Sequence, residues 1–305
     1  MLATFAPIIA LGIASTVSAL PLLYNATLAA RATSTLFPVS DSTSWSVSKD
    51  ASNAVPFDDT TFRPVSEIKD LTHDVVNAPD GVPSIQAKYP KGSFKPSAQP
   101  RGGISFYAPG PDNVDLTTAA EATLSYTVLF EDGFDFVKGG KLPGLYGGNS
   151  DSKAIGCSGG RRDDGCFSAR FMWRPEGAGE LYTYLPPDSP ENKAVCNVPP
   201  KSECNDVFGA SVGRGSFSFT PGTRTTIGQR VKLNDVGQAN GELELFVDGK
   251  SMFTVPGLVL RTADSGRIRG IQMQSFFGGN DASWATPKEQ NVFFGDFSVA
   301  ITKAL

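Results

Sequence analysis

The sequence predicts an all-β protein in which two sheets pack face to face as a sandwich or jelly roll. About a dozen apolar runs of strand length follow one another along the chain, and turn-forming Gly and Pro separate them. Phe is abundant at 21 residues, beside 32 Gly and 22 Pro, which favours strands that end in frequent turns. No long segment repeats its apolar residues with a strong helical period, so a helical bundle is not expected.

The first segment of the chain, residues 1–19, is expected to be a secretory signal peptide. Its apolar run leads to Val17-Ser18-Ala19, whose small side chains suit a cleavage site. The residues before the run include no Lys or Arg, which such signals usually carry, and a short anchor helix is the alternative. The run is too short and interrupted to span a bilayer comfortably, so we expect a secreted, extracellular protein with no membrane association after cleavage.

Residues 20–61 are expected to form a linker or pro-segment, because they are rich in Ser and Thr and show no apolar period. Asn25 begins an Asn-Ala-Thr sequon, which makes it a candidate glycosylation site. The folded domain is therefore expected over residues 62–305. It opens with residues 65–76, which are expected to form one short helix.

The predicted strands of this domain share a short apolar run and a boundary at Gly, Pro or a charged residue. They cover residues 84–90, 104–110, 122–130, 167–173, 180–186, 215–222, 225–233, 241–250, 251–255, 258–260, 268–279 and 292–301. Asp248-Gly249 is the dipeptide of a tight hairpin turn between two of them. No internal repeat is present, so the strands are expected to belong to one domain.

The four cysteines indicate an oxidising compartment and two disulfide bonds. They fall in two close pairs, Cys157 with Cys166 and Cys196 with Cys204, and neither pair has the spacing of a zinc site. Because His73 is the only histidine, we expect no metal and no metal cofactor. Four cysteines allow three connectivities, and we expect the two local pairs to form.

The formal net charge of −4 argues against a partner that a basic protein surface would attract. Nucleic acid is therefore not an expected partner. Any site for an anion must be a local cluster of basic side chains.

One face of several predicted strands carries basic, amide and hydroxyl side chains opposite an apolar face, because side chains alternate along a strand. These polar residues are Ser168, Arg170, Arg174, Tyr182, Tyr184, Arg230, Lys232, Gln272 and Gln274. Arg holds a carboxylate in two parallel hydrogen bonds, and this composition is typical of a concave groove for a carboxylated sugar chain. Paired tyrosines also serve cross-strand packing, which is the structural alternative.

Lys141 stands in an unusual setting, within FDFVKGGKLPGLYGG at residues 134–148. It follows two glycines and precedes Leu-Pro-Gly, and flanking glycines let a ligand approach the backbone closely. The alternative is a turn-rich crossing in which Lys141 is merely solvated. The charged residues 161–164 that follow are expected to form a solvated loop.

KGGKLPGLYGG, followed by a Ser-x-Arg strand and a Tyr-x-Tyr strand, resembles polysaccharide lyase family 14, whose members include alginate and glucuronan lyases. The likeness runs over about residues 85–303, is strongest over 134–184, and is greatest to the secreted fungal members. The resemblance implies a β-jelly roll. It also implies a set of catalytic residues made up of Lys141, Ser168, Arg170, Tyr182 and Tyr184. Viral members carry a histidine near the active site, whereas His73 lies upstream of these motifs, so roles of that histidine are not carried over.

The reaction that this resemblance implies removes the C5 proton of a uronate and expels the 4-linked sugar oxygen. Arg170 and Lys141 are expected to offset the negative charge that builds on the substrate carboxylate, with help from Gln272 or Gln274. Nearby cations are expected to favour a tyrosine phenolate as the base. We assign proton transfer to Tyr184 and a positioning role to Tyr182, and no metal or organic cofactor is required.

Two other classes of protein remain open at this stage. A retaining glycoside hydrolase needs two close carboxylates, and the only Glu-x-Glu pair, Glu242 with Glu244, is expected to be solvated. A lectin-like jelly roll would use the same groove without turnover. The expected partner is an anionic polysaccharide and the expected state a monomer. The sequence does not distinguish glucuronan from alginate, or endo from exo cleavage.

Overall fold

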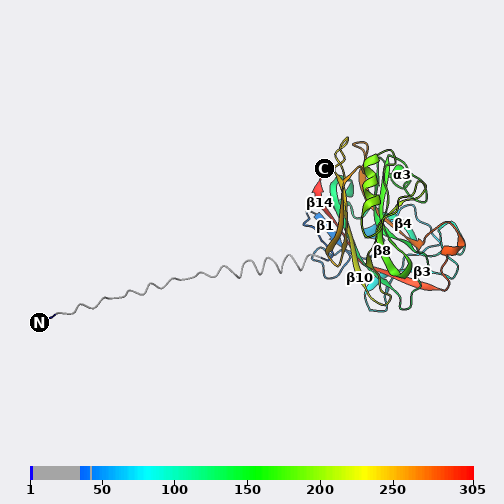
Figure 1. The fold of residues 1–305 in the computed structure, drawn as a ribbon. Helices are drawn as coiled ribbons and strands as arrows, with labels where there is room; N and C mark the ends of the chain where they lie inside the picture. The colour runs from blue at the N-terminus through cyan, green and yellow to red at the C-terminus, as the bar shows by residue number, and fades with distance from the viewer. Residues whose placement is uncertain (3–34, 42) are drawn as a thin grey trace. The chain divides into compact units, whose positions relative to one another are not determined.

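The computed structural model describes residues 1, 2, 35–41 and 43–305, and Figure 1 shows their arrangement as a ribbon. The predicted signal cleavage site and the Asn25 sequon lie outside the described residues. Every helix and strand below belongs to the compact unit Ser34–Leu305.

Two antiparallel sheets form the domain as a jelly roll, which confirms the predicted fold class. The first, sheet A, has the order β12-β11-β10-β5-β14-β3-β2, with β1 also paired to β14. Its strands are β1 (Thr43–Ser46), β2 (Val75–Asn77), β3 (Pro83–Tyr89), β5 (Ala119–Phe130), β10 (Thr225–Lys232), β11 (Gly241–Val247), β12 (Lys250–Leu258) and β14 (Gln290–Ala304).

The second sheet, sheet B, has the order β4-β13-β6-β7-β8-β9. Its strands are β4 (Ile104–Ala108), β6 (Gly140–Gly148), β7 (Cys166–Trp173), β8 (Ala178–Tyr184), β9 (Ala210–Ser218) and β13 (Arg267–Phe277). The helical elements are short: α2 (Asp59–Phe62), α3 (Asp151–Ala154), and the 3₁₀ turns η1 (Asp112–Val114), η2 (Leu116–Thr118), η3 (Pro175–Gly177), η4 (Pro190–Asn197) and η5 (Ala282–Trp284).

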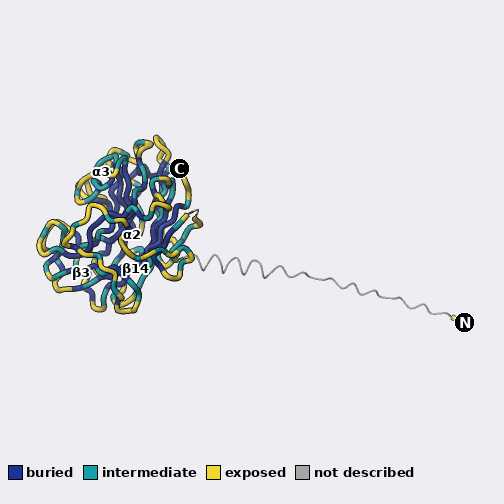
Figure 2. The backbone as a smooth tube through the Cα atoms, turned by 180° about the vertical axis from the view of Figure 1, so that it is seen from behind, coloured by how far each residue is buried: buried dark blue, intermediate teal, exposed yellow. Residues whose placement is uncertain are grey.

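Aromatic side chains fill the space between the two sheets. Trp173 of β7 packs edge-on against Phe130 of β5 at 5.5 Å between ring centroids, and Tyr126 stacks on Phe297 at 5.0 Å. Figure 2 shows the buried strands in dark blue, surrounded by loops whose residues are mostly exposed or intermediate in burial. Each large side chain buried in this way contributes about 1.5–3 kcal/mol, so the abundant Phe residues stabilise the sandwich directly.

The N-terminal boundary of the domain differs from the one expected at residue 62. Residues 43–46 form β1, which pairs with β14, and the Trp45 side chain is only 1% exposed. Phe57 also packs against the core. The structure therefore places these residues in the folded domain rather than in a linker, because isolated aromatic side chains enter the core from a segment without apolar periodicity.

The helix expected at residues 65–76 is not formed. Val65 pairs with Tyr107 of β4, Ile68 N–H donates to Ser105 O, and β2 begins at Val75. The open edge of β4 offers hydrogen-bond partners to the backbone of this segment. Pairing with that edge satisfies backbone N–H and C=O groups that a short helix would otherwise satisfy.

The segment around Lys141, for which a turn-rich crossing was the alternative, forms strand β6 from Gly140 to Gly148 in the middle of sheet B. Its pairing with both neighbours slips between Lys141 and Gly144. Pro143 falls inside this irregularity, where its lack of an N–H does not interrupt a regular ladder. The slip places Lys141 opposite Met172 of β7, on the strand rather than in a solvated loop.

Both expected disulfide bonds are present. Cys157 is bonded to Cys166 and Cys196 to Cys204, and no cysteine of the described chain is free. Each bond closes a short loop, which stabilises the fold by on the order of 2–3 kcal/mol in the loop-closure model.

Candidate active site

The outer face of sheet B, away from sheet A, brings together most of the residues predicted for the site. Backbone pairing sets Ser168 of β7 opposite Tyr184 of β8, and Arg170 opposite Tyr182. The residues that alternate with them along β7, such as Ala169, point the other way and are fully buried between the sheets. The predicted alternation of the two faces is therefore confirmed, although Ser168 and Arg170 are also buried, because loops cover this face.

Lys141 lies against the aromatic ring of Tyr182. Its Nζ atom is 3.1 Å from the ring centroid and donates a hydrogen bond to Met172 Sδ at 2.9 Å. Burial, followed by the positive charges of Arg174 and Arg170, holds the pKa of Lys141 well below its usual value. The neutral amine, which can accept a proton, is therefore easier to form than in a solvated lysine.

Arg170 is a buried cation that is only 4% exposed. Its Nε donates to Leu142 O at 3.2 Å and its Nη2 to Gln274 O at 2.6 Å, so both partners are neutral carbonyls. Burial lowers the pKa of Arg170 to about 10, which still leaves it charged at neutral pH. Among the described residues no carboxylate forms an ion pair with Arg170, so its charge is available to an anionic ligand.

The two tyrosines of β8 differ in their surroundings. Their rings meet edge to face at 5.9 Å, and the Tyr184 hydroxyl oxygen accepts a hydrogen bond from Gly160 N–H at 2.9 Å. Burial, and then the neighbouring Tyr184, raises the pKa of Tyr182. Arg174 acts in the opposite direction, but its effect is smaller. Burial therefore disfavours a phenolate at Tyr182, the tyrosine for which a positioning role was predicted.

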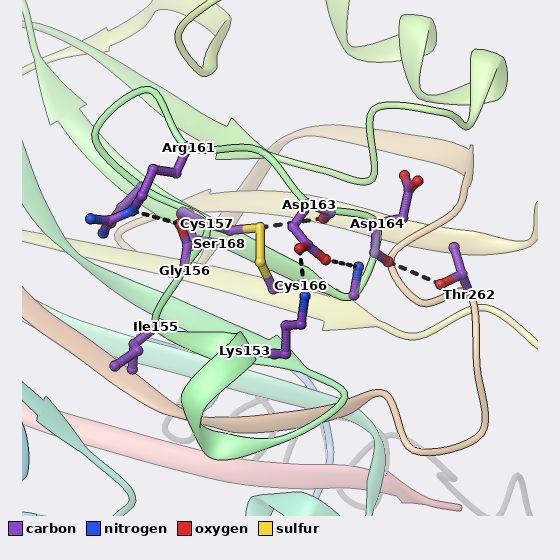
Figure 3. The surroundings of a disulfide bond; sticks show 12 residues. Lys153, Ile155, Gly156, Cys157, Arg161, Asp163, Asp164, Cys166, Ser168 and Thr262 are labelled. Carbon is purple, nitrogen blue, oxygen red and sulfur yellow. Dashed lines mark hydrogen bonds and ion pairs between the residues drawn. A yellow bond between two sulfur atoms is a disulfide. The ribbon is translucent and has the colours of Figure 1, made fainter.

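Ser168 does not face open solvent. Its hydroxyl donates to Cys157 O at 2.8 Å, within the loop that the Cys157–Cys166 disulfide closes (Figure 3). Ser168 therefore connects the centre of sheet B to this loop.

The two glutamines extend the polar face onto β13. Gln272 Nε2 donates to Gln274 Oε1 at 2.8 Å, and Gln274 Nε2 donates to Ser105 Oγ of β4 at 3.2 Å. Since Arg170 binds Gln274 O, these amides border the guanidinium.

Glu180 and Arg214 were not predicted as site residues. The Glu180 side chain is 0% exposed and binds Arg174 Nη2 at 2.7 Å and Arg214 Nε at 2.9 Å, with a further hydrogen bond from Ser211. The alternation that selected Tyr182 and Tyr184 also places Glu180 on their face. A carboxylate on a basic face was the signal that could have identified it.

Arg230 and Lys232 do not belong to this group, which corrects the prediction that they line the same groove. Both lie on β10 of sheet A, and Gln229 between the two sheets shows that they face away from sheet B. Arg230 binds three glutamates and Lys232 binds one of them. Alternation identifies the face of a strand but not the sheet to which the strand belongs.

The three glutamates that bind Arg230 are Glu121, Glu242 and Glu244. The two from β11 therefore act as ion-pair partners on the outside of sheet A, rather than as a pair of catalytic carboxylates.

His73 lies apart from the site as well. Its ring centroid is 4.4 Å from that of Phe106, and its Nε2 is 2.9 Å from Asp59 Oδ1. It lines a surface cavity of about 790 Å³ formed by residues 57–60, 67, 69 and 71–75. In the described part of the chain, no group of three His, Cys, Asp or Glu side chains could hold a metal ion. No helix there is long and apolar enough to cross a membrane.

Comparisons with known proteins identify the family and the solved structures that this chain resembles. The family model described as polysaccharide lyase 14 matches residues 77–297. A solved PL-14 alginate lyase from the marine Aplysia kurodai is 30% identical with a TM-score of 0.69, covering 78% of this chain and 90% of that chain. An alginate lyase from a Chlorella virus is 24% identical with a TM-score of 0.63, covering 76% and 89%. A comparison with curated protein sequences found no match.

Proposed function

The chain belongs to polysaccharide lyase family 14 and is a lyase, and we propose that it cleaves a 4-linked polyuronate by β-elimination. The observation that carries this proposal is the buried Arg170 guanidinium, whose hydrogen-bond partners in the described chain are carbonyl oxygens. A uronate carboxylate supplies the missing negative charge. The C5 proton of the same sugar is adjacent to the C4–O4 bond that is broken.

Alginate is the first polyuronate to test. The solved structure that is 30% identical to this chain is named an alginate lyase, which supports alginate as the substrate. Glucuronan remains the alternative, since both polymers carry one carboxylate on every sugar. Arg174, with Gln272 and Gln274, would bind groups of the sugar chain beside the Arg170 site.

The mechanism begins with the carboxylate bound at Arg170, whose charge offsets the negative charge that develops as C5 loses its proton. The lowered pKa of Lys141 supports its neutral amine as the base, in place of the tyrosine base that the sequence suggested. Tyr182 holds this amine through the contact between Nζ and its ring.

Tyr184 then acts as the acid. As the C4–O4 bond breaks, the Tyr184 hydroxyl gives its proton to the departing O4, and the electrons of the C5–H bond form the C4=C5 double bond. Lys141 is left as an ammonium and Tyr184 as a phenolate. Exchange of one proton through water restores both groups, so no other reactant is consumed.

Secretion is the remaining part of the proposal. The candidate signal peptide at residues 1–19 and the two disulfide bonds support an extracellular enzyme in an oxidising environment. Residues of one chain supply all the groups assigned above, which supports function as a monomer.

The test is to incubate the purified chain with polymannuronate, polyguluronate, polyglucuronate and polygalacturonate, and to follow the ultraviolet absorbance of the unsaturated product. We expect a rise with at least one 4-linked polyuronate. Cleavage without unsaturated ends would instead indicate a hydrolase, and retention of the polymer without cleavage would indicate a lectin.

Variants of the two tyrosines test the assignment of the acid. Tyr184→Phe should lower kcat by roughly 100-fold or more, because it removes the proton donor and keeps the ring. Tyr182→Phe is the matched control, since the ring that holds Lys141 remains, and its kcat should fall far less. Equal losses in the two variants would contradict the assignment.

A further inference from the structure

The loop at residues 155–161 is attached to the face of sheet B by three hydrogen bonds that involve its backbone. Ser168 Oγ of β7 donates to Cys157 O at 2.8 Å, and Tyr107 Oη of β4 donates to Ile155 O at 3.4 Å. The third bond runs from Gly160 N–H to the Tyr184 hydroxyl of β8 at 2.9 Å. Three different strands therefore fix the position of one loop.

The Cys157–Cys166 disulfide joins this loop to the first residue of β7 (Figure 3). Both cysteines are buried and form one apolar cluster with Met172, Tyr182 and Tyr184. The bond is thus in the interior of the site, beside the side chains assigned to the reaction, and not at its surface.

Polar contacts within the loop and between the residues that flank it restrict it further. Lys153 Nζ binds Asp163 Oδ2 at 2.8 Å, and Arg161 Nε reaches back to Gly156 O at 3.2 Å, as Figure 3 shows. These contacts are exposed and individually weak, so the disulfide is the strongest constraint on the loop.

The backbone conformation of Gly160 presents its N–H to Tyr184. Gly159 and Gly160 have φ values of 63° and 85°, and two successive left-handed residues are readily adopted only by glycine. Chain reversal at these two residues turns the amide of the loop toward sheet B. Without the Cys157–Cys166 disulfide, the loop would be less constrained to this conformation.

The direction of the Gly160 bond matters for the chemistry. Because the Tyr184 oxygen accepts this bond, the proton of the hydroxyl remains available for donation to another oxygen. After that proton has left, the same N–H donates to a phenolate, and hydrogen bonds to an ionised acceptor are stronger than those to a neutral one. The contact therefore strengthens as the reaction proceeds.

We propose that the loop closed by the Cys157–Cys166 disulfide is a positioning element for the proton donor, in which Gly160 N–H orients the Tyr184 hydroxyl and stabilises the phenolate that proton transfer creates. This inference rests on the proposed role of Tyr184 as the acid. It makes turnover, rather than substrate binding, depend on the oxidised state of this one disulfide.

The experiment compares two double variants with the wild type. Cys157→Ser with Cys166→Ser removes the proposed constraint, and Cys196→Ser with Cys204→Ser is the matched control, since the two loops have similar length. On the best polyuronate, well below each unfolding temperature, we expect the first pair to lower kcat about 10-fold or more with KM within about twofold. The control should keep kcat within about twofold of the wild type. Equal losses of kcat in both pairs would overturn the proposal.

Reversible reduction covers the case in which the first double variant does not fold. The chain has four cysteines, and the Cys196→Ser, Cys204→Ser control keeps two of them. The Cys157–Cys166 bond is therefore the one disulfide that this variant can form. Dithiothreitol should lower its kcat, and reoxidation should restore it. A kcat that does not change while thiol titration shows two free cysteines would overturn the proposal.

A double-mutant cycle separates positioning of Tyr184 from a general structural effect. In the Tyr184→Phe background there is no hydroxyl to position, so loss of the Cys157–Cys166 bond should cause no further loss of the residual kcat. The same factor in both backgrounds would overturn this inference and leave the proposed function intact. If Tyr184→Phe alone kept the wild-type kcat, the assignment of the acid would fail, and this inference with it.

Discussion

At the scale of the residue, Lys141 is surrounded by an unequal set of charges. Arg170, Arg174 and Arg214 act on it as cations, and Glu180 is the one anion among the groups that shift its pKa. Tyr182 covers the amine with its ring. Burial, together with this excess of positive charge, lowers the pKa of Lys141 and so favours its use as a base.

Replacing Arg174 should therefore change the pH dependence of the reaction. Lys141 must be neutral to accept a proton, so kcat/KM falls as the pH drops through its pKa. Arg174→Gln removes a positive charge, which raises the pKa of Lys141 and moves this acidic limb to higher pH. The measurement is kcat/KM across a pH series.

Arg174→Lys is the matched control for that prediction. It keeps the charge and loses the planar contact with Glu180, so the acidic limb should stay close to that of the wild type. An equal shift in both variants would show that packing, and not charge, is responsible.

At the scale of the element, the sequence predicted the faces of the strands but not their assembly. Alternation placed Arg170 and Tyr182 on the polar faces of β7 and β8, and pairing in the structure sets them opposite each other. Alternation also grouped Arg230 with these residues, although β10 belongs to the other sheet. Strand order depends on contacts between distant parts of the chain, which no local pattern records.

The position of Lys141 was likewise found by motif rather than by strand pattern. Pro and Gly usually interrupt a strand, so Pro143 and the surrounding glycines argue against a central strand in the sequence. The slip in pairing between Lys141 and Gly144 accommodates them in β6. The Glu180 ion pairs were missed because a single Glu on a strand is ordinarily solvated, and its partners Arg174 and Arg214 lie on separate segments.

The ion pairs of Glu180 and those of Glu242 should respond differently to neutralisation of the glutamate. Glu180→Gln leaves two arginines without their buried carboxylate and should lower the free energy of unfolding by about 3–5 kcal/mol. Glu242→Gln, on the outside of sheet A, should cost less than about 1 kcal/mol, because its partner Arg230 keeps two other glutamates. Urea unfolding of both variants gives the comparison, and similar costs would contradict the difference in burial.

At the scale of the whole molecule, the N-terminal segment is part of the stable domain. Trp45 and β1 lie in the region that was expected to be a linker, and they pack onto β14 from the opposite end of the chain. A mature protein that began at residue 62 would lose both.

Truncation tests this boundary. A chain that starts at residue 62 should unfold at a lower temperature than one that starts at residue 35, since loss of a buried Trp alone costs about 3–5 kcal/mol. Thermal unfolding followed by circular dichroism measures the difference. Equal unfolding temperatures would show that residues 35–61 are dispensable, as a removable pro-segment would be.

The pairing of the first strand with the last has a consequence for how the chain folds during synthesis. Ser46 and Ser298 share a hydrogen bond across 252 positions of sequence, and β14 also pairs with β5 in the middle of sheet A. Sheet A therefore cannot close until the last strand has left the ribosome, and contacts of such long range form slowly. A nascent chain of this topology cannot complete sheet A during synthesis, because β5 lacks one of its two partner strands until β14 has emerged.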